Sequence, residues 1–103
     1  MTYPDAMAIL IDPAKWWRHE RWWGHMVSDV SYQELHDFAA TLGVPTRGFD
    51  RDHYDIPESL HEVAIEAGAL LVTSRELVER LLASGLRRPK PRSLEAVPLL
   101  DAD

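Results

Sequence analysis

Three aspartates, a histidine and a tyrosine lie within the stretch FDRDHYDIP, at positions 49 to 57 of this 103-residue chain. His53 and Asp55 are two residues apart, so on an extended segment their side chains point to the same side. An imidazole and a carboxylate on one side suit acid–base catalysis or the binding of one cation. Asp52 adds an oxygen ligand of the kind that Mg²⁺ and Mn²⁺ prefer. We therefore predict that His53 and Asp55 are catalytic, and that Asp52, His53 and Asp55 are ligands of Mg²⁺, Mn²⁺ or Zn²⁺.

A structural interpretation of the same stretch is an alternative. Asp55 and Glu58 have the spacing of a capping box, in which Asp55 caps the helix that follows and His53 holds the loop together. Capping explains one of these polar residues and leaves the others without a role. Both interpretations stay open at this level.

Two further segments place polar residues where a site is expected. His25 and Asp29 in HMVSD are four residues apart and share one face if this segment forms a helical turn, which makes His25 a third candidate catalytic residue. Asp12 ends an apolar run, where α/β enzymes often place a catalytic or metal-binding carboxylate. An aspartate before a proline also makes an ordinary turn.

The start of a predicted helix provides another candidate, since its free N–H groups suit a phosphate or a carboxylate. Ser74 lies there, and Arg75 adds a fork of donors, although helix capping alone explains the serine. His36 flanks an apolar helix face, where a partly buried structural histidine is the simpler interpretation. The candidate ligand-binding residues are Asp12, Trp17, Trp22, Asp29, His36, Tyr54, Ser74 and Arg75.

All four tryptophans fall in KWWRHERWWGH at residues 15 to 25, interleaved with lysine and arginine. Such a segment can stack on a base or on a ligand ring. More often it folds an irregular loop onto the domain as a small satellite core. Because four tryptophans so close together are difficult to bury in one place, we expect one pair, represented by Trp17 and Trp22, to line a pocket.

Apolar periodicity and capping signals predict the elements that position these residues. Capping boxes of Ser31 with Glu34 and of Thr73 with Glu76 begin two of the helices. The predicted helices cover residues 30–43, 57–69 and 75–85. The predicted strands cover residues 6–12, 44–49 and 70–74, and residues 15–25 are predicted to be irregular.

Strands that alternate with helices predict a small α/β domain of two or three layers, with three helices and a short, mostly parallel sheet of about three strands. Ligands of such sheets bind outside the carboxyl ends of the strands. Three polar connections would then meet at one edge. We assign residues 1–85 to this domain and residues 86–103 to a proline-rich, basic-then-acidic tail that is flexible or partner-dependent.

Composition narrows the classes of function. Cysteine is absent, which excludes disulfides and thiolate metal sites, so a metal must be bound by His, Asp or Glu. The formal net charge of −6 argues against an extended nucleic-acid footprint, which needs clustered Lys and Arg. The chain shows no signal-peptide pattern and no membrane-spanning run. We therefore expect a cytoplasmic protein without a membrane partner, whose oligomeric state the sequence does not reveal.

The motifs ILIDP, HMVSD, ELHDFAATLGVP, HYD and GALLVTSRELV, with the tryptophan-rich segment, occur in an order that resembles a small bacterial and phage family, domain of unknown function 4031. The resemblance covers roughly residues 8–82 and brings no established reaction. It implies that the polar signature of the family includes Asp12, His25, Asp29, His36, His53, Tyr54 and Asp55.

Together these patterns predict a polar His/Asp pocket at the carboxyl edge of the sheet. The leading hypothesis is hydrolysis, assisted by a divalent metal, of a phosphate-containing small molecule such as a nucleotide. The alternative is a non-catalytic module that binds a nucleotide or a protein through its Trp and Arg residues. A third interpretation gives the polar motif only a loop-ordering role.

Overall fold

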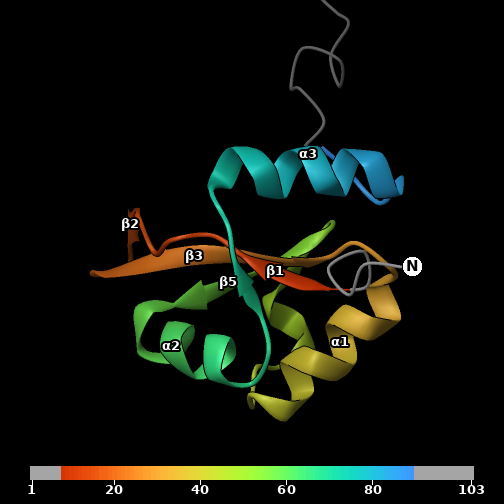
Figure 1. The fold of residues 1–103 in the computed structure, drawn as a ribbon. Coiled ribbons are helices and arrows are strands. Elements are labelled where there is room, and N and C mark those ends of the chain that lie inside the picture. Colours follow the sequence, from red (N-terminus) through yellow and green to blue (C-terminus); the bar gives the residue numbers. More distant parts are fainter. Residues whose placement is uncertain (1–7, 90–103) are drawn as a thin grey trace, which may run out of the picture.

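Three helices cover the two faces of a single sheet in the computed structural model, which describes residues 8–89. Helices α1 (Tyr32–Thr41) and α2 (Glu58–Glu66) lie on one side of the sheet, and α3 (Ser74–Ser84) lies on the other (Figure 1). The domain is therefore a three-layer α/β structure. Within the described residues, none of these helices has the length and apolar character that crossing a bilayer requires.

The sheet is mixed and mostly antiparallel. Its order is β4-β5-β3-β1-β6, and β2 pairs with β3 beside this path. Among the described strands only β1 and β6 run parallel. The predicted small α/β domain with three helices is confirmed, whereas the predicted sheet of about three mostly parallel strands is wrong. The strands are β1 (Ile9–Ile11), β2 (Trp16–Arg18), β3 (Arg21–Ser28), β4 (Phe49–Asp50), β5 (His53–Pro57) and β6 (Leu70–Leu71).

A tight hairpin replaces the irregular loop predicted for residues 15–25. Its strands β2 and β3 are joined by His19 and Glu20, whose φ angles are 50° and 61°. Positive φ at both positions is the combination of a type I′ turn, which matches the twist of paired strands. This turn usually contains Asn-Gly, so the pair His-Glu carries no hairpin signal in the sequence.

The opening stretch FDRDHYDIP forms a second hairpin, in which β4 pairs antiparallel with β5. Arg51 in its turn also has a positive φ of 61°. Along β5 the side chains alternate: Tyr54 and Ile56 are fully buried, while His53 and Asp55 are partly exposed on the opposite face. Helix α2 begins after Pro57 without a side-chain cap, so Asp55 is not the capping residue of the structural interpretation.

Strand alternation divides the core into two clusters, one on each face of the sheet. Leu10 and Val27 pack against Leu77 and Leu81 of α3. The residues between them along the strands point the other way and pack against α1 and α2. This larger cluster contains Ile9, Ile11, Met26, Leu35, Ala39, Tyr54, Ile56, Ala64 and Ala69. Each face of β3 is therefore committed to one helical layer.

The first residues of the predicted tail contact this body. Leu86 packs on the cluster beneath α3, and its carbonyl accepts a hydrogen bond from the Tyr32 hydroxyl. The backbone N–H of Arg88 donates to Asp52 Oδ2 at 2.6 Å. Residues 90–103 of the predicted tail lie outside the described residues.

These contacts predict that a chain ending at residue 85 is less stable than one ending at residue 89. The shorter chain loses the partly buried side chain of Leu86 and a donor to a buried carboxylate, which together are worth about 2 to 4 kcal/mol of unfolding free energy. Urea unfolding of the two truncated chains measures the difference. Equal midpoints would show that Leu86 and Arg88 contribute nothing.

Candidate functional site

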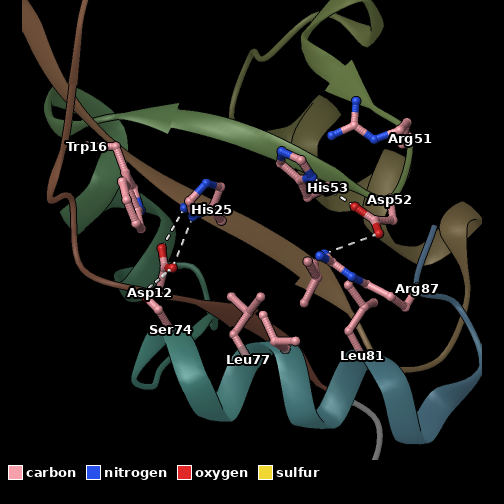
Figure 2. A pocket seen from close by; sticks show the side chains of 12 residues that line it. Asp12, Trp16, His25, Arg51, Asp52, His53, Ser74, Leu77, Leu81 and Arg87 are labelled. Atoms are coloured by element: carbon pink, nitrogen blue, oxygen red, sulfur yellow. Dashed lines mark hydrogen bonds and ion pairs between the residues drawn. The ribbon is translucent and has the colours of Figure 1, made fainter. Parts of the chain in front are cut away.

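A cavity of about 270 Å³ lies between α3 and the open part of the sheet (Figure 2). It follows the face of the sheet from the carboxyl end of β1 to the start of β5, rather than lying outside one edge as a parallel sheet would require. One wall is apolar and comes from Val27, Leu77, Val78 and Leu81. The other wall is polar and comes from Asp12, His25, Arg51, Asp52, His53, Ser74 and Arg87, with Trp16 beside His25.

Asp12 orients His25 from below the surface. Its carboxylate is 1% exposed and accepts hydrogen bonds from the backbone N–H of His25 at 2.6 Å, from His25 Nδ1 at 3.0 Å and from the Ser74 hydroxyl at 2.7 Å. Burial opposes ionisation of Asp12, but these hydrogen bonds outweigh it and lower its pKa below 3.8. The bond between His25 Nδ1 and Asp12 Oδ2 orients the ring, and Nε2 is the ring nitrogen that this bond leaves for another partner.

His53 lies between two carboxylates. Its Nδ1 donates to Asp52 Oδ1 at 2.8 Å, and its Nε2 lies 3.2 Å from Asp55 Oδ1. Burial alone would lower the pKa of His53, but the hydrogen bonds to Asp55 and Asp52 raise it above 6.5. Burial raises the pKa of Asp55, and the opposing effects of His53, His25 and Arg18 leave it below 3.8. Asp52, His53 and Asp55 are therefore linked in one chain of polar contacts.

Asp52 has the same role behind His53 that Asp12 has behind His25. It is 1% exposed, and the second oxygen of its carboxylate accepts the Arg88 N–H and lies 3.6 Å from Arg87 Nη1. A buried carboxylate without such partners would cost several kcal/mol. Each imidazole of the cavity is therefore oriented by its own buried aspartate.

The two imidazoles and one carboxylate converge. One ring nitrogen of His25, one of His53 and a carboxylate oxygen of Asp55 all lie within 4.8 Å of one another. The rings are 5.2 Å apart and nearly perpendicular. This convergence follows from strand register, because His25 is paired with Asp55 and His53 is two residues further along the same face. Two histidines and a carboxylate are a common donor set for Zn²⁺ and related ions.

Gly24 allows β3 to approach Asp12 closely. A Cβ atom at position 24 would lie 2.7 Å from the Asp12 carbonyl oxygen and 3.3 Å from the ring of His61, whose Nε2 bonds to that same oxygen at 2.8 Å. Contacts this short are not tolerated, so a side chain here would displace Asp12 or α2. The glycine therefore helps to place the Asp12–His25 pair.

The predicted site residues divide between the cavity and other places. Asp12, His25, Asp52, His53 and Ser74 line the cavity, and Asp55 completes the cluster with the two histidines. Trp17 and Trp22 do not line it, and they contact each other edge to face on the hairpin.

The remaining candidates lie elsewhere. Asp29 pairs with Arg80 at 2.8 Å at the far end of β3, which is a strand and not the predicted helical turn. His36 Nδ1 is 2.7 Å from the hydroxyl of the buried Tyr54, on the side of α1, and burial raises the pKa of that tyrosine. Arg75 is exposed and pairs with Glu79 along α3.

Three polar or aromatic residues of the cavity, Trp16, Arg51 and Arg87, were not singled out from the sequence. Trp16 was not distinguished from its neighbours, because which tryptophans face the site depends on strand register. Arg51 lies in a turn, and Arg87 belongs to the predicted tail, where local patterns indicate no contact. The only local signal is the alternation of aromatic and basic residues, which does not specify a face.

Comparison with known proteins gives a family and no further relative. A family model described as "Protein of unknown function (DUF4031)" matches residues 9–84. No curated protein and no solved structure matches the chain.

Gly24→Ala is expected to destabilise the fold by about 1 to 3 kcal/mol, because the added methyl group overlaps backbone atoms of Asp12. Gly48→Ala is the matched control, since its nearest neighbour would lie at an ordinary 3.4 Å. Chemical denaturation of the two variants and the wild type measures the effect. Equal stabilities of the two variants would contradict the close approach.

The pKa shifts also predict how stability depends on pH in the metal-free protein. Asp12 and Asp55 have lowered pKa values, so they stabilise the fold above pH 3.8 and lose this effect as the pH falls. His53 has a raised pKa, so its contribution is complete below pH 6.5 and is lost as the pH rises through the folded-state value.

Melting curves in the presence of a chelator, recorded from acidic to alkaline pH, measure this dependence. We expect the wild-type midpoint to decline above pH 6.5 and His53→Gln to show a flatter decline over the same range. Parallel profiles of the two proteins would show that His53 does not titrate as described.

Proposed function

We propose that this chain, which belongs to the DUF4031 family of proteins of unknown function, binds a divalent metal ion through His25, His53 and Asp55. With the ion bound, the protein would hydrolyse a phosphate-containing small molecule such as a nucleotide. The family match confirms the resemblance recognised in the sequence and supplies no reaction. The proposal therefore depends on the geometry of the cavity.

The main support for a metal site is that two histidines and a carboxylate converge on one point. Each histidine is also held at its other ring nitrogen by a buried aspartate. Metal-binding histidines generally have such a partner, which sets the tautomer and the orientation of the ring. A loop-ordering role does not require two imidazoles to be aimed at one point. Three protein ligands also leave coordination positions open for water and substrate.

The rest of the cavity suits a phosphate ester. A bound divalent ion would polarise a phosphoryl oxygen and lower the pKa of a water molecule. Arg51 and Arg87 line the same polar wall and can pair with the remaining phosphate oxygens. Among the described residues the Nε atom of Arg51 is buried without a hydrogen-bond partner, so this guanidinium has donors to spare.

The proposed hydrolysis needs water as its only co-reactant. The water oxygen forms a bond to phosphorus, the bond from phosphorus to the ester oxygen breaks, and that ester oxygen leaves with a proton as an alcohol. The two arginines would oppose the negative charge on phosphorus-bound oxygens during this displacement.

A binding module without catalysis is the second candidate. Trp16 is 49% exposed and borders the cavity, opposite an apolar wall from α3. This arrangement suits a ligand with a planar ring, whether or not a reaction follows.

Metal binding is tested by melting curves with Mg²⁺, Mn²⁺ and Zn²⁺. We expect at least one ion to raise the wild-type midpoint, by the equivalent of about 2.7 kcal/mol at a hundredfold excess over its dissociation constant. His25→Ala and Asp55→Ala should remove the ion-dependent shift. The control is His19→Asn, which removes a histidine from the β2–β3 turn and should keep the shift.

Turnover is tested on the same proteins with a panel of nucleotides and a chromogenic phosphate ester. Arg87→Gln is expected to lower kcat/KM by about 10- to 100-fold while the metal still binds. If no ion shifts the wild-type midpoint, or if the shift survives His25→Ala, the metal site is wrong. Metal binding without turnover of any panel member would favour the binding module.

A further inference from the structure

One face of the β2–β3 hairpin continues directly into the group formed by His25, His53 and Asp55. Trp16 is paired with Trp23, and Arg18 with Arg21. Strand alternation places these four side chains on the face that carries His25 further along β3. We call them the hairpin face.

Side-chain contacts agree with this assignment. The ring of Trp16 meets the ring of His25 edge to face at 5.4 Å. Arg18 Nη2 lies 3.2 Å from Asp55 Oδ2, and the guanidinium of Arg21 lies over Trp23. Trp17 and Trp22, which are paired with each other, belong to the opposite face by the same alternation. The hairpin face and the cavity are therefore one continuous surface.

This surface is open to solvent where it leaves the cavity. The hairpin extends beyond α3, at the left of Figure 1, so the helix covers only the part of the sheet around Leu10 and Val27. Trp16 keeps 49% of its area exposed, and the side chain of Arg18 keeps 64%. Trp17 and Trp22 are also exposed on the opposite face, at 59% and 41%, but of these three tryptophans only Trp16 borders the cavity.

The charge of the surface points to an anionic partner. The chain as a whole has a net charge of −6, yet Arg18 and Arg21 lie on the hairpin face, and Arg51 and Arg87 line the cavity that it meets. Arg18, Arg51 and Arg87 are each paired with one carboxylate, and a guanidinium has five N–H donors, so each keeps donors for an anion. Basic side chains interleaved with aromatic rings are the combination that binds single-stranded nucleic acid, since the arginines pair with phosphates and the rings stack on bases. The rest of the acidic molecule would repel the same strand.

We propose that the hairpin face binds a short single strand of nucleic acid and leads one of its phosphodiesters to the His25, His53 and Asp55 cluster. A base would stack on Trp16, and flanking phosphates would pair with Arg18 and Arg21. His25 lies four positions after Arg21 along β3, or about 13 Å away. At the stacked spacing of about 3.4 Å per nucleotide, this length holds at most about four nucleotides.

The reaction in this inference is the hydrolysis of the proposed function, and the inference adds that the substrate is a short single strand of nucleic acid. Water adds through its oxygen to the phosphorus of the diester, one bond from phosphorus to a nucleoside oxygen breaks, and that oxygen leaves with a proton. The products are two shorter strands, one ending in a phosphate and the other in a hydroxyl. A mononucleotide held in the cavity cannot also reach Arg21.

The test uses the full chain and fluorescently labelled oligothymidylates and oligouridylates of one, two, four and eight nucleotides, with and without Mn²⁺. Anisotropy titrations are expected to show affinity that rises by about tenfold for each stacked base and levels off beyond four nucleotides. Affinity should also fall with added salt. Affinity that does not depend on length would overturn the proposal.

Matched variants test which face of the β2–β3 hairpin binds the strand. Trp16→Leu and Arg21→Gln should each weaken binding of the four-nucleotide strand by at least about tenfold, and Arg21→Gln should leave mononucleotide binding unchanged. Trp17→Leu and Trp22→Leu alter the opposite face and should retain strand binding. Equal losses in Trp16→Leu and Trp17→Leu would overturn the assignment. Arg21 is exposed, so its variant remains informative if a tryptophan variant fails to fold.

Rates of hydrolysis of strands and of mononucleotides distinguish an error in the strand-binding site from an error in the proposed hydrolase function. Metal-dependent hydrolysis of mononucleotides with no preference for longer strands would overturn the strand site and leave the hydrolase standing. Strand binding that follows the hairpin face, without hydrolysis of strands or mononucleotides, would support the strand site and overturn the hydrolase.

Discussion

The register between β3 and β5 is the constraint on which the site depends. It pairs His25 with Asp55 and Met26 with Tyr54, so His25 and Asp55 share the face toward α3 while Met26 and Tyr54 share the face that packs on α1 and α2. A slip of one residue would expose Tyr54 and Ile56 on the side of α3 and force charged groups into the cluster beneath α1 and α2. The burial of these apolar residues therefore holds His25, His53 and Asp55 close together.

Two buried carboxylates join the site to the rest of the fold. Asp12 connects the end of β1 to β3 and, through Ser74, to the start of α3, while Asp52 connects the second hairpin to the segment after α3. Buried charges are weak sources of stability, because desolvation cancels much of what their hydrogen bonds contribute. Their strength lies in orientation. Each fixes one nitrogen of a histidine and thereby aims the other at the same point, which is the arrangement that a metal site requires and that packing alone does not explain.

The sequence predicted the features that have local causes. Ser31 and Thr73 cap α1 and α3 through bonds to the N–H groups of Glu34 and Glu76, as their spacing indicates, and Gly85 ends α3 with a φ of 83°. The two-residue spacing of His53 and Asp55 also placed them correctly on one side of an extended segment. The β2–β3 hairpin was missed because His19 and Glu20 occupy a turn that normally selects Asn and Gly, so no residue type signalled the reversal of the chain. Strands β3 and β5 were both absent from the predicted strands, so the antiparallel pairs of β3 with β1 and with β5 were missed as well.

By itself, then, the sequence determined the three helices, the small α/β class and a chemical inventory of His, Asp, Trp and Arg with no thiol to compete for a metal. Only the tertiary structure decided which of these residues meet. Asp12 reaches His25 across 13 residues, Ser74 reaches Asp12 across 62, and the Arg88 N–H reaches Asp52 across 36. Trp16 faces the cavity while Trp17 faces away, although the two are neighbours of the same type. These outcomes depend on which strand faces are buried against which helix, and that choice is made by packing of the whole domain, which no short segment encodes.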